Sequence, residues 1–173
     1  MRVVLASIAL FLCVVCMSFF FVFSFHASSP IQHDVKTFLD TGSGVLPFSE
    51  SANSHMLDVY WVLFVFRIVA AVSVLTLVAL HKYLSMRSVR IVGACLVATP
   101  IVLALINWDV LFRVFHLVLF PQGNWMFPAN SLLIQTYPES FFIFFSSVWA
   151  LLVVVFGLLC VFSQKMMCAL KSC

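Results

Sequence analysis

The sequence predicts an all-α membrane protein with four transmembrane helices. Of its 173 residues, 64% are hydrophobic, only 9% are charged and 20 are phenylalanine. A soluble domain of this length could not bury so much apolar surface. A helix needs roughly 20 residues to cross a bilayer, and four apolar runs approach or exceed that length: about 3–25, 59–80, 91–106 and 141–162. We therefore expect a single integral membrane domain over residues 1–173.

The first and third runs need separate arguments. Run 3–25 is longer than the roughly 7 to 15 apolar residues of a signal peptide, so we expect a retained helix, although Ala27, Ser28 and Ser29 resemble a weak cleavage site. Run 91–106 is short and contains Pro100, so we expect its helix to continue into the segment that follows.

The distribution of charge predicts the orientation of the chain. Lys and Arg are retained on the cytoplasmic side, and six of them lie at the chain ends or in the connection 81–90: Arg2, Lys82, Arg87, Arg90, Lys165 and Lys171. All six acidic residues lie in the other two connections. We expect both termini in the cytoplasm, with loops 26–58 and 107–140 outside. The net charge of +3 is scattered, which excludes a nucleic-acid partner.

The outer loops differ in what they are expected to form. Loop 26–58 contains TGSG at 41–44, which indicates a turn between two short extended pieces, so a short β-hairpin is expected there. Neither outer loop contains cysteine, so a disulfide-linked outer domain is excluded. Cys13 and Cys16 lie within the first run and are interpreted as packing residues.

His55 and Asp58 form the first candidate pair. They are three residues apart, just before the second run. If a helix begins near Ser54, both side chains project from its first turn, and the carboxylate could hold the imidazole N–H and fix its tautomer. The alternative is that Asp58 only complements the helix N-terminus while His55 rests among lipid head groups.

Segment 107–125, NWDVLFRVFHLVLFPQGNW, places three polar residues in an apolar setting. At 100° per residue, Asp109, Arg113 and His116 fall within an arc of about 60° on one helical face. Such a polar stripe normally faces a protein interior or a wet cavity. Asp109 and Arg113 are spaced to pair, which leaves His116 with a free hydrogen-bonding edge.

Further candidates follow this stripe and precede the last run. Pro121 is expected to end the helix, and Gly123 permits a tight turn that would direct Asn124 and Trp125 back toward the membrane. Trp125 also suits an interfacial aromatic belt. Glu139, in the opening turn of the last helix, either binds substrate or favours the helix dipole.

Arg67 lies roughly 13 Å into the second run at the helical rise. A charge at this depth could extend toward the interface, pair with Asp109 or Glu139, or contact a lipid carbonyl or phosphate. It is retained as a candidate substrate-side residue.

The ordered motifs of the outer segments resemble a known family. HMLDV at 55–59, followed by WDVLFRVFHLVLFPQGNWMFPANSLLIQTYPESFF at 108–142, is similar to a family of small bacterial membrane proteins that includes the lipoprotein intramolecular transacylases. The combination of HMxDV, FHxxxF, GNW and PESFF is more specific than any one motif.

The resemblance implies a reaction and two central residues. The sn-2 acyl chain of a diacylglyceryl cysteine, at the N-terminus of a bacterial lipoprotein, would move to the α-amine of that cysteine and leave a lyso-form lipoprotein. By their motifs, His55 and His116 correspond to the two central histidines. With Asp58 orienting His55, they would supply a base and an acid; Arg113, Asn124 or a backbone N–H would stabilise the oxyanion. We expect no metal and no cofactor.

Two other classes of protein remain open at this stage. A b-type haem or quinone protein would use His26, His55 and His116, because all three approach the outer face. A non-catalytic membrane scaffold would use the polar stripe to bind another protein's helix.

Overall fold

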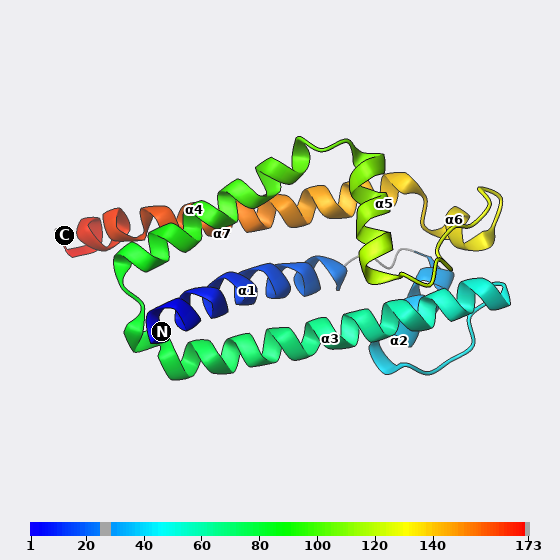
Figure 1. Ribbon diagram of the computed structural model, residues 1–173, viewed down its shortest axis with the longest axis horizontal. Helices are drawn as coiled ribbons and strands as arrows, with labels where there is room; N and C mark the ends of the chain where they lie inside the picture. The colour runs from blue at the N-terminus through cyan, green and yellow to red at the C-terminus, as the bar shows by residue number, and fades with distance from the viewer. Residues whose placement is uncertain (25–28, 172–173) are drawn as a thin grey trace.

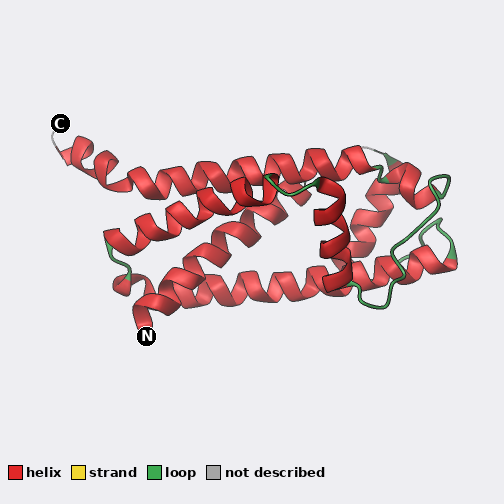
Figure 2. Ribbon diagram, turned by 45° about the horizontal axis from the view of Figure 1, so that its top comes forward, coloured by secondary structure: helices red, strands yellow, loops and turns green. Residues whose placement is uncertain are grey.

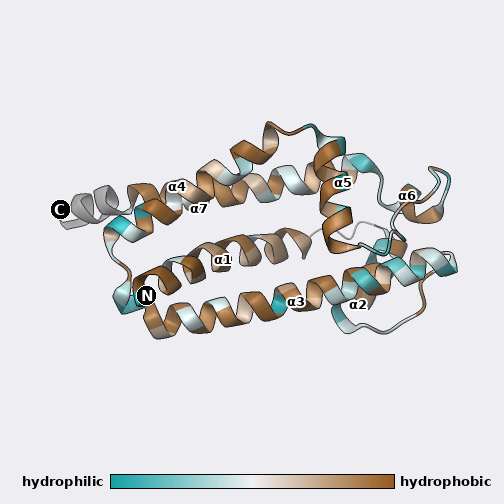
Figure 3. Cartoon of the chain, in the orientation of Figure 1, coloured by the Kyte–Doolittle hydropathy of each residue, from teal (hydrophilic) through white to brown (hydrophobic). Residues whose placement is uncertain are grey.

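Four long helices form the body of the protein. The computed structural model describes residues 1–24 and 29–171, and four of its helices are long and apolar enough to cross a membrane. They are α1 (Arg2–Phe23), α3 (Glu50–Leu80), α4 (Met86–Ala104) and α7 (Glu139–Lys171). They lie side by side, and apolar residues dominate them (Figures 1 and 3). The predicted class, an all-α membrane protein with four spanning helices, is confirmed.

The shorter elements gather at one end of the bundle. These elements are α2 (Pro30–Thr41), α5 (Trp108–Leu119) and α6 (Leu132–Thr136), together with their connecting loops (Figure 1). We call this end of the bundle the loop end. The beginning of α1 and the short 3-10 helix η1 (His81–Tyr83) lie at the opposite end. The Arg2 guanidinium donates a hydrogen bond to the Tyr83 hydroxyl at 2.7 Å there.

The expected β-hairpin in the first outer loop is wrong. Residues 30–41 form α2, and the part of the loop that the structure describes contains no strand (Figure 2). Ser29 caps the helix by accepting from the Gln32 backbone N–H, and Pro30 occupies its first turn, both typical start signals. The TGSG sequence ends the helix instead of joining strands, because Gly42 takes the left-handed conformation at φ 71°.

α2 is held against the bundle by an apolar core and one polar tie. The core at the loop end consists of Val35, Leu39, Leu46, Ala52, Met56, Leu63, Leu133 and Tyr137. The Gln32 side chain donates to the Thr136 carbonyl oxygen at 3.1 Å, which joins α2 to the segment before α7. The expected cleavage residues Ala27 and Ser28, and the candidate haem ligand His26, lie outside the described residues.

α3 begins earlier than its apolar run predicted. Its N-cap is Ser49, whose side chain accepts from the Ala52 backbone N–H, so the expected start near Ser54 is wrong by about one turn. The helix has 31 residues, which at the helical rise is about 47 Å and exceeds a hydrocarbon core of about 30 Å. The first turns of α3 therefore extend past the apolar run.

α4 does not continue into the polar stripe. It ends at Ala104 despite accommodating Pro100, and a separate helix, α5, begins at Trp108. The Asn107 side chain caps α5 by accepting from the backbone N–H groups of Asp109 and Val110. This cap allows the chain to change direction, and α5 runs across the direction of the long helices at the loop end (Figures 1 and 2).

α4 and α7 approach closely through two glycines. A Cβ on Gly93 would lie 2.6 Å from the Gly157 carbonyl oxygen, and a Cβ on Gly157 would lie 2.8 Å from that of Gly93. Neither position has room for a side chain, so the two backbones pack directly.

Candidate active site

α3 places His55 and Asp58 at the loop end. His55 is only 7% exposed and lies one turn before the half-buried Asp58. Ala52 and Met56, on the same turns of the helix, belong to the apolar core, which fixes the rotation of this part of α3.

α5 places His116 opposite them. Val110, Val114, Leu117 and Val118 are exposed on one side of this helix, whereas His116 is only 8% exposed. The His116 Nδ1 lies 2.8 Å from the Phe112 carbonyl oxygen. A carbonyl only accepts, so Nδ1 carries the proton and donates it. The lone pair of the neutral imidazole is therefore on Nε2, the position from which a base acts.

The two imidazole rings lie close together among aromatic side chains. Their centroids are 6.3 Å apart and their planes are tilted by 30°. Phe120 touches both, with centroid distances of 4.7 Å to His55 and 5.7 Å to His116. Trp125 packs on His116 at 4.9 Å, and Phe127 lies 5.7 Å from His55. Residues 61 positions apart in the chain thus share one apolar site.

Burial lowers the pKa of His116 below its usual 6.5, and the hydrogen bond to the Phe112 carbonyl opposes this shift only partly. The imidazole is therefore mainly neutral at pH 7, which is the protonation state that a general base requires.

Asp58 has different partners from those expected. Its Oδ2 accepts from the Gln122 side-chain amide at 2.7 Å and from the Asn124 amide at 2.6 Å. The expectation that Asp58 holds the ring N–H of His55 is wrong, because the carboxylate accepts from these two amides and forms no hydrogen bond to His55, whose polar neighbour is the Asn124 side chain. Asp58 instead fixes the loop after α5 onto α3.

That loop has the tight turn predicted at Gly123. The glycine adopts φ 79°, and its backbone N–H donates to the Phe120 carbonyl oxygen at 3.1 Å. The turn brings Asn124 and Trp125 back to the site. Gln122 was not among the expected site residues, and neither were Phe120 and Phe127. An amide directly before a turn glycine was the only signal for Gln122, and the aromatic residues are indistinguishable in sequence from the many others.

The remaining charged candidates lie on the surface of the protein or at a distance from the histidine pair. Asp109, Arg113 and Glu139 are exposed. The ion pair expected between Asp109 and Arg113 is not formed; within the described part of the chain, the salt bridges join Asp40 to Lys36 and to Arg67.

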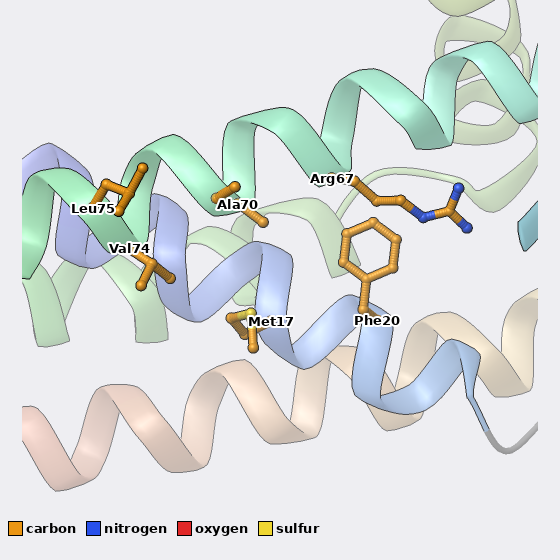
Figure 4. A pocket seen from close by; sticks show the side chains of 7 residues that line it. Met17, Phe20, Arg67, Ala70, Val74 and Leu75 are labelled. Carbon is orange, nitrogen blue, oxygen red and sulfur yellow. The ribbon is translucent and has the colours of Figure 1, made fainter.

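Arg67 ties α3 to the end of α2. Its guanidinium donates to the Leu39 carbonyl oxygen and to the Asp40 carboxylate, both at 2.9 Å, and neither Asp109 nor Glu139 is its partner. It also forms one end of an open apolar groove of about 460 Å³ between α1 and α3, where it lies beside Phe20 (Figure 4). It is twelve residues from His55 along α3, or about 18 Å, and so lies apart from the histidine pair.

The described residues contain no group of three or more His, Cys, Asp or Glu side chains that could hold a metal ion. The chemistry available at the pair is that of two imidazoles and the amide and indole groups around them. The fold and this pair define a class: multi-pass membrane proteins with two neighbouring buried histidines at one end of a helix bundle.

Comparison with known proteins narrows this class to one family. The family model for the lipoprotein intramolecular transacylase Lit matches residues 26–142, which are 117 of the 173 residues. The chain belongs to the Lit family. It is therefore a membrane-integral acyltransferase, an intramolecular transacylase of lipoproteins. This assignment favours an enzyme over the haem or quinone protein and the scaffold. No curated protein matches the sequence significantly.

Two solved structures share the fold. One is the lipoprotein intramolecular transacylase Lit from Bacillus cereus, with a TM-score of 0.82 and 19% identity over 99% of this chain and 96% of that one. The other is a variant of the same protein with one histidine replaced by arginine, with a TM-score of 0.79 and 18% identity over 99% of this chain and 92% of that one. Both are membrane-integral, as expected from the four apolar helices here.

Proposed function

We propose that this protein moves the sn-2 acyl chain of a diacylglyceryl cysteine to the α-amine of the same cysteine, at the outer face of a bacterial cell membrane. The substrate is the lipid-modified N-terminal cysteine of a lipoprotein, and the product is its lyso-form. The observation that carries this proposal is the pair of buried imidazoles with ring centroids 6.3 Å apart.

The reaction needs proton transfer at two atoms. The amine nitrogen attacks the ester carbonyl carbon, a C–N bond forms, and the nitrogen loses a proton to one imidazole. The C–O bond to the glyceryl oxygen then breaks, and that oxygen takes a proton from an imidazolium. An ester and an amine become an amide and an alcohol, with no other reactant. Two imidazoles on either side of one carbonyl can supply both transfers.

The tautomer of His116 supports its part in this scheme. Because its Nδ1–H is used by the Phe112 carbonyl, Nε2 is left to exchange protons with the substrate. The aromatic rings of Phe120, Trp125 and Phe127 exclude water from the pair, which favours acyl transfer to the amine over hydrolysis of the ester.

The charged candidates take supporting roles in this proposal. Asp58 acts through the loop that contains Asn124, and Arg67 holds α2 in place through Asp40. The exposed Asp109, Arg113 and Glu139 face the surroundings and would contact the polar part of the substrate or the head groups of membrane lipids. Both chain ends lie on the cytoplasmic side in this arrangement.

Incubation with a synthetic diacylglyceryl-cysteine lipopeptide tests the proposal. Intramolecular transfer leaves the mass unchanged, so the measurement is fragmentation mass spectrometry, which locates the acyl chain on nitrogen or oxygen. The expected product has an N-acyl group and no free amine. A lipopeptide already acetylated on the amine is the matched control and should remain unchanged. Release of free fatty acid, or an unaltered acyl position, would contradict the proposal.

A further inference from the structure

Two polar atoms beside the histidine pair are buried without a hydrogen bond of regular geometry. One is the Oδ1 of Asn124, which faces His55, and the other is the Nε1 of Trp125, which has no partner among the residues that the structure describes. The indole ring packs on His116 with a centroid distance of 4.9 Å. A buried polar atom without a regular hydrogen bond destabilises the fold, so two at one site indicate a functional demand for them.

The orientation of the Asn124 amide is fixed by Asp58. Its Nδ2 donates to the Asp58 carboxylate at 2.6 Å, and an ionised carboxylate can only accept. The amide nitrogen must therefore face Asp58, which leaves the carbonyl oxygen as the atom without a hydrogen bond of regular geometry. The Gln122 amide donates to the same carboxylate oxygen and further restrains this loop.

The two atoms have opposite hydrogen-bonding character. The Asn124 Oδ1 can only accept a hydrogen bond, and the Trp125 indole N–H can only donate one. The two reacting groups of the proposed substrate have the complementary pattern, because an amine presents N–H donors and an ester presents a carbonyl acceptor.

We propose that Asn124 Oδ1 holds an N–H of the substrate α-amine while the Trp125 indole N–H holds the oxygen of the ester carbonyl. This inference rests on the proposed transacylation. A neutral amine has two N–H groups: the one lost in the reaction goes to an imidazole, and the one retained in the product amide stays on Asn124. As the C–N bond forms, the carbonyl π electrons move to oxygen, and the indole N–H stabilises the charge that develops there.

Removal of the indole N–H tests the carbonyl contact. Replacement of Trp125 by benzothienylalanine keeps the bicyclic ring and exchanges the N–H for sulfur, and Trp125→Phe is the simpler variant. Loss of one oxyanion donor typically lowers kcat by about 10²- to 10³-fold, so we expect a fall of about 10²-fold with little change in KM. Trp61→Phe is the matched control, because Trp61 is 55% exposed on α3, and it should retain wild-type turnover.

The outcomes separate this inference from the proposed function. If the wild-type protein converts the lipopeptide and the turnover of the benzothienylalanine variant is within about twofold of the wild-type value, the role of the indole N–H is overturned. If the wild-type protein converts no lipopeptide, the proposed function itself is refuted.

An exchange of two side chains tests the amine contact. In the double variant Asp58→Asn with Asn124→Asp, residue 58 can donate to residue 124, and a carboxylate oxygen faces the amine. A negative charge beside the amine favours the protonated form of the amine. The acid limb of the pH–rate profile should therefore move to higher pH. Above that limb, the double variant should be more active than either single variant. Recovery with the wild-type midpoint, or no recovery, would overturn the contact between Asn124 and the amine.

Discussion

His116 acts as a base only when its imidazole is neutral, and its environment keeps it so near pH 7. Burial lowers its pKa below the usual 6.5. A group with a lowered pKa is neutral over a wider range of pH, and the neutral form is lost only as the pH falls through the lowered value.

The pH dependence of turnover should follow from this shift. We predict that the acid limb of kcat/KM contains two ionisations: that of the substrate α-amine, whose usual pKa is about 7.7 to 8.0, and one below pH 6.5, where His116 becomes protonated. Initial rates of N-acyl product formation between pH 4.5 and 8.5 measure this profile. An acid limb that shows only the ionisation of the amine down to pH 4.5 would be inconsistent with His116 as the base.

Asp58 should matter through the loop that it holds. Asp58→Asn removes the charge that accepts from Gln122 and Asn124, and hydrogen bonds to charged groups contribute about 1.5 to 3 kcal/mol each. We predict a loss of turnover of at least about tenfold with normal insertion into the membrane. Gln122→Leu removes only one of these bonds and should have a smaller effect. Equal and negligible effects of both variants would show that this loop needs no anchor.

The sequence predicted that the two histidines lie close together, but not the hydrogen-bond partners of Asp58. The spacing of His55 and Asp58 suggested a direct hydrogen bond, whereas in the structure the carboxylate binds two amides from residues 64 and 66 positions away. Spacing along one helix describes only local pairs, and the turn at Gly123 that returns the loop to α3 brings in distant competitors for the carboxylate.

At the scale of single elements, the apolar runs were sufficient to predict the spanning helices but not the short ones. Loop 26–58 was expected to contain a hairpin because TGSG is a turn sequence, yet Ser29, Pro30 and the spacing of Val35 and Leu39 specify a helix that ends at Gly42. The same glycine serves as a helix C-cap or as a turn residue, and only the segment before it distinguishes the two.

The contact between α4 and α7 should be sensitive to a single methyl group. Gly157→Ala adds a Cβ that would lie 2.8 Å from the Gly93 carbonyl oxygen, so the helices must separate, at a cost of about 1 to 3 kcal/mol. This outweighs the roughly 1 kcal/mol that alanine gains over glycine in a helix. Thermal unfolding in detergent should show a lower midpoint, with Leu158→Ala, on the exposed side of α7, as the control. An unchanged or higher midpoint for Gly157→Ala would contradict close backbone packing.

For the whole molecule, the charges in the connections predict which end faces outward. The loop end contains the histidine pair and the acidic residues, which lie in α2, in α5 and in the first turns of α3 and α7, whereas Arg2 and the connection 81–90 lie at the other end (Figure 1). From the positive-inside rule we therefore expect the site on the outer side of the membrane.

Cysteine labelling in intact cells tests this orientation. Ser43→Cys is exposed after α2, and Lys82→Cys is exposed in the opposite connection. We predict that a membrane-impermeant maleimide labels Ser43→Cys in intact cells but labels Lys82→Cys only after permeabilisation. The native chain, with no cysteine in the outer loops, is the control. Labelling of the Lys82→Cys variant from outside, above that of the native chain, would reverse the topology.

The central claim is that two imidazoles act on one ester carbonyl, and separate alanine replacements test it most directly. We predict that His55→Ala and His116→Ala each lower N-acyl transfer by about 10²-fold or more without loss of membrane insertion, while His33→Ala, on the exposed side of α2, leaves it unchanged. The measurement is the fraction of lipopeptide with its acyl chain on nitrogen after a fixed time. Near wild-type transfer by either the His55 or the His116 variant would contradict the claim.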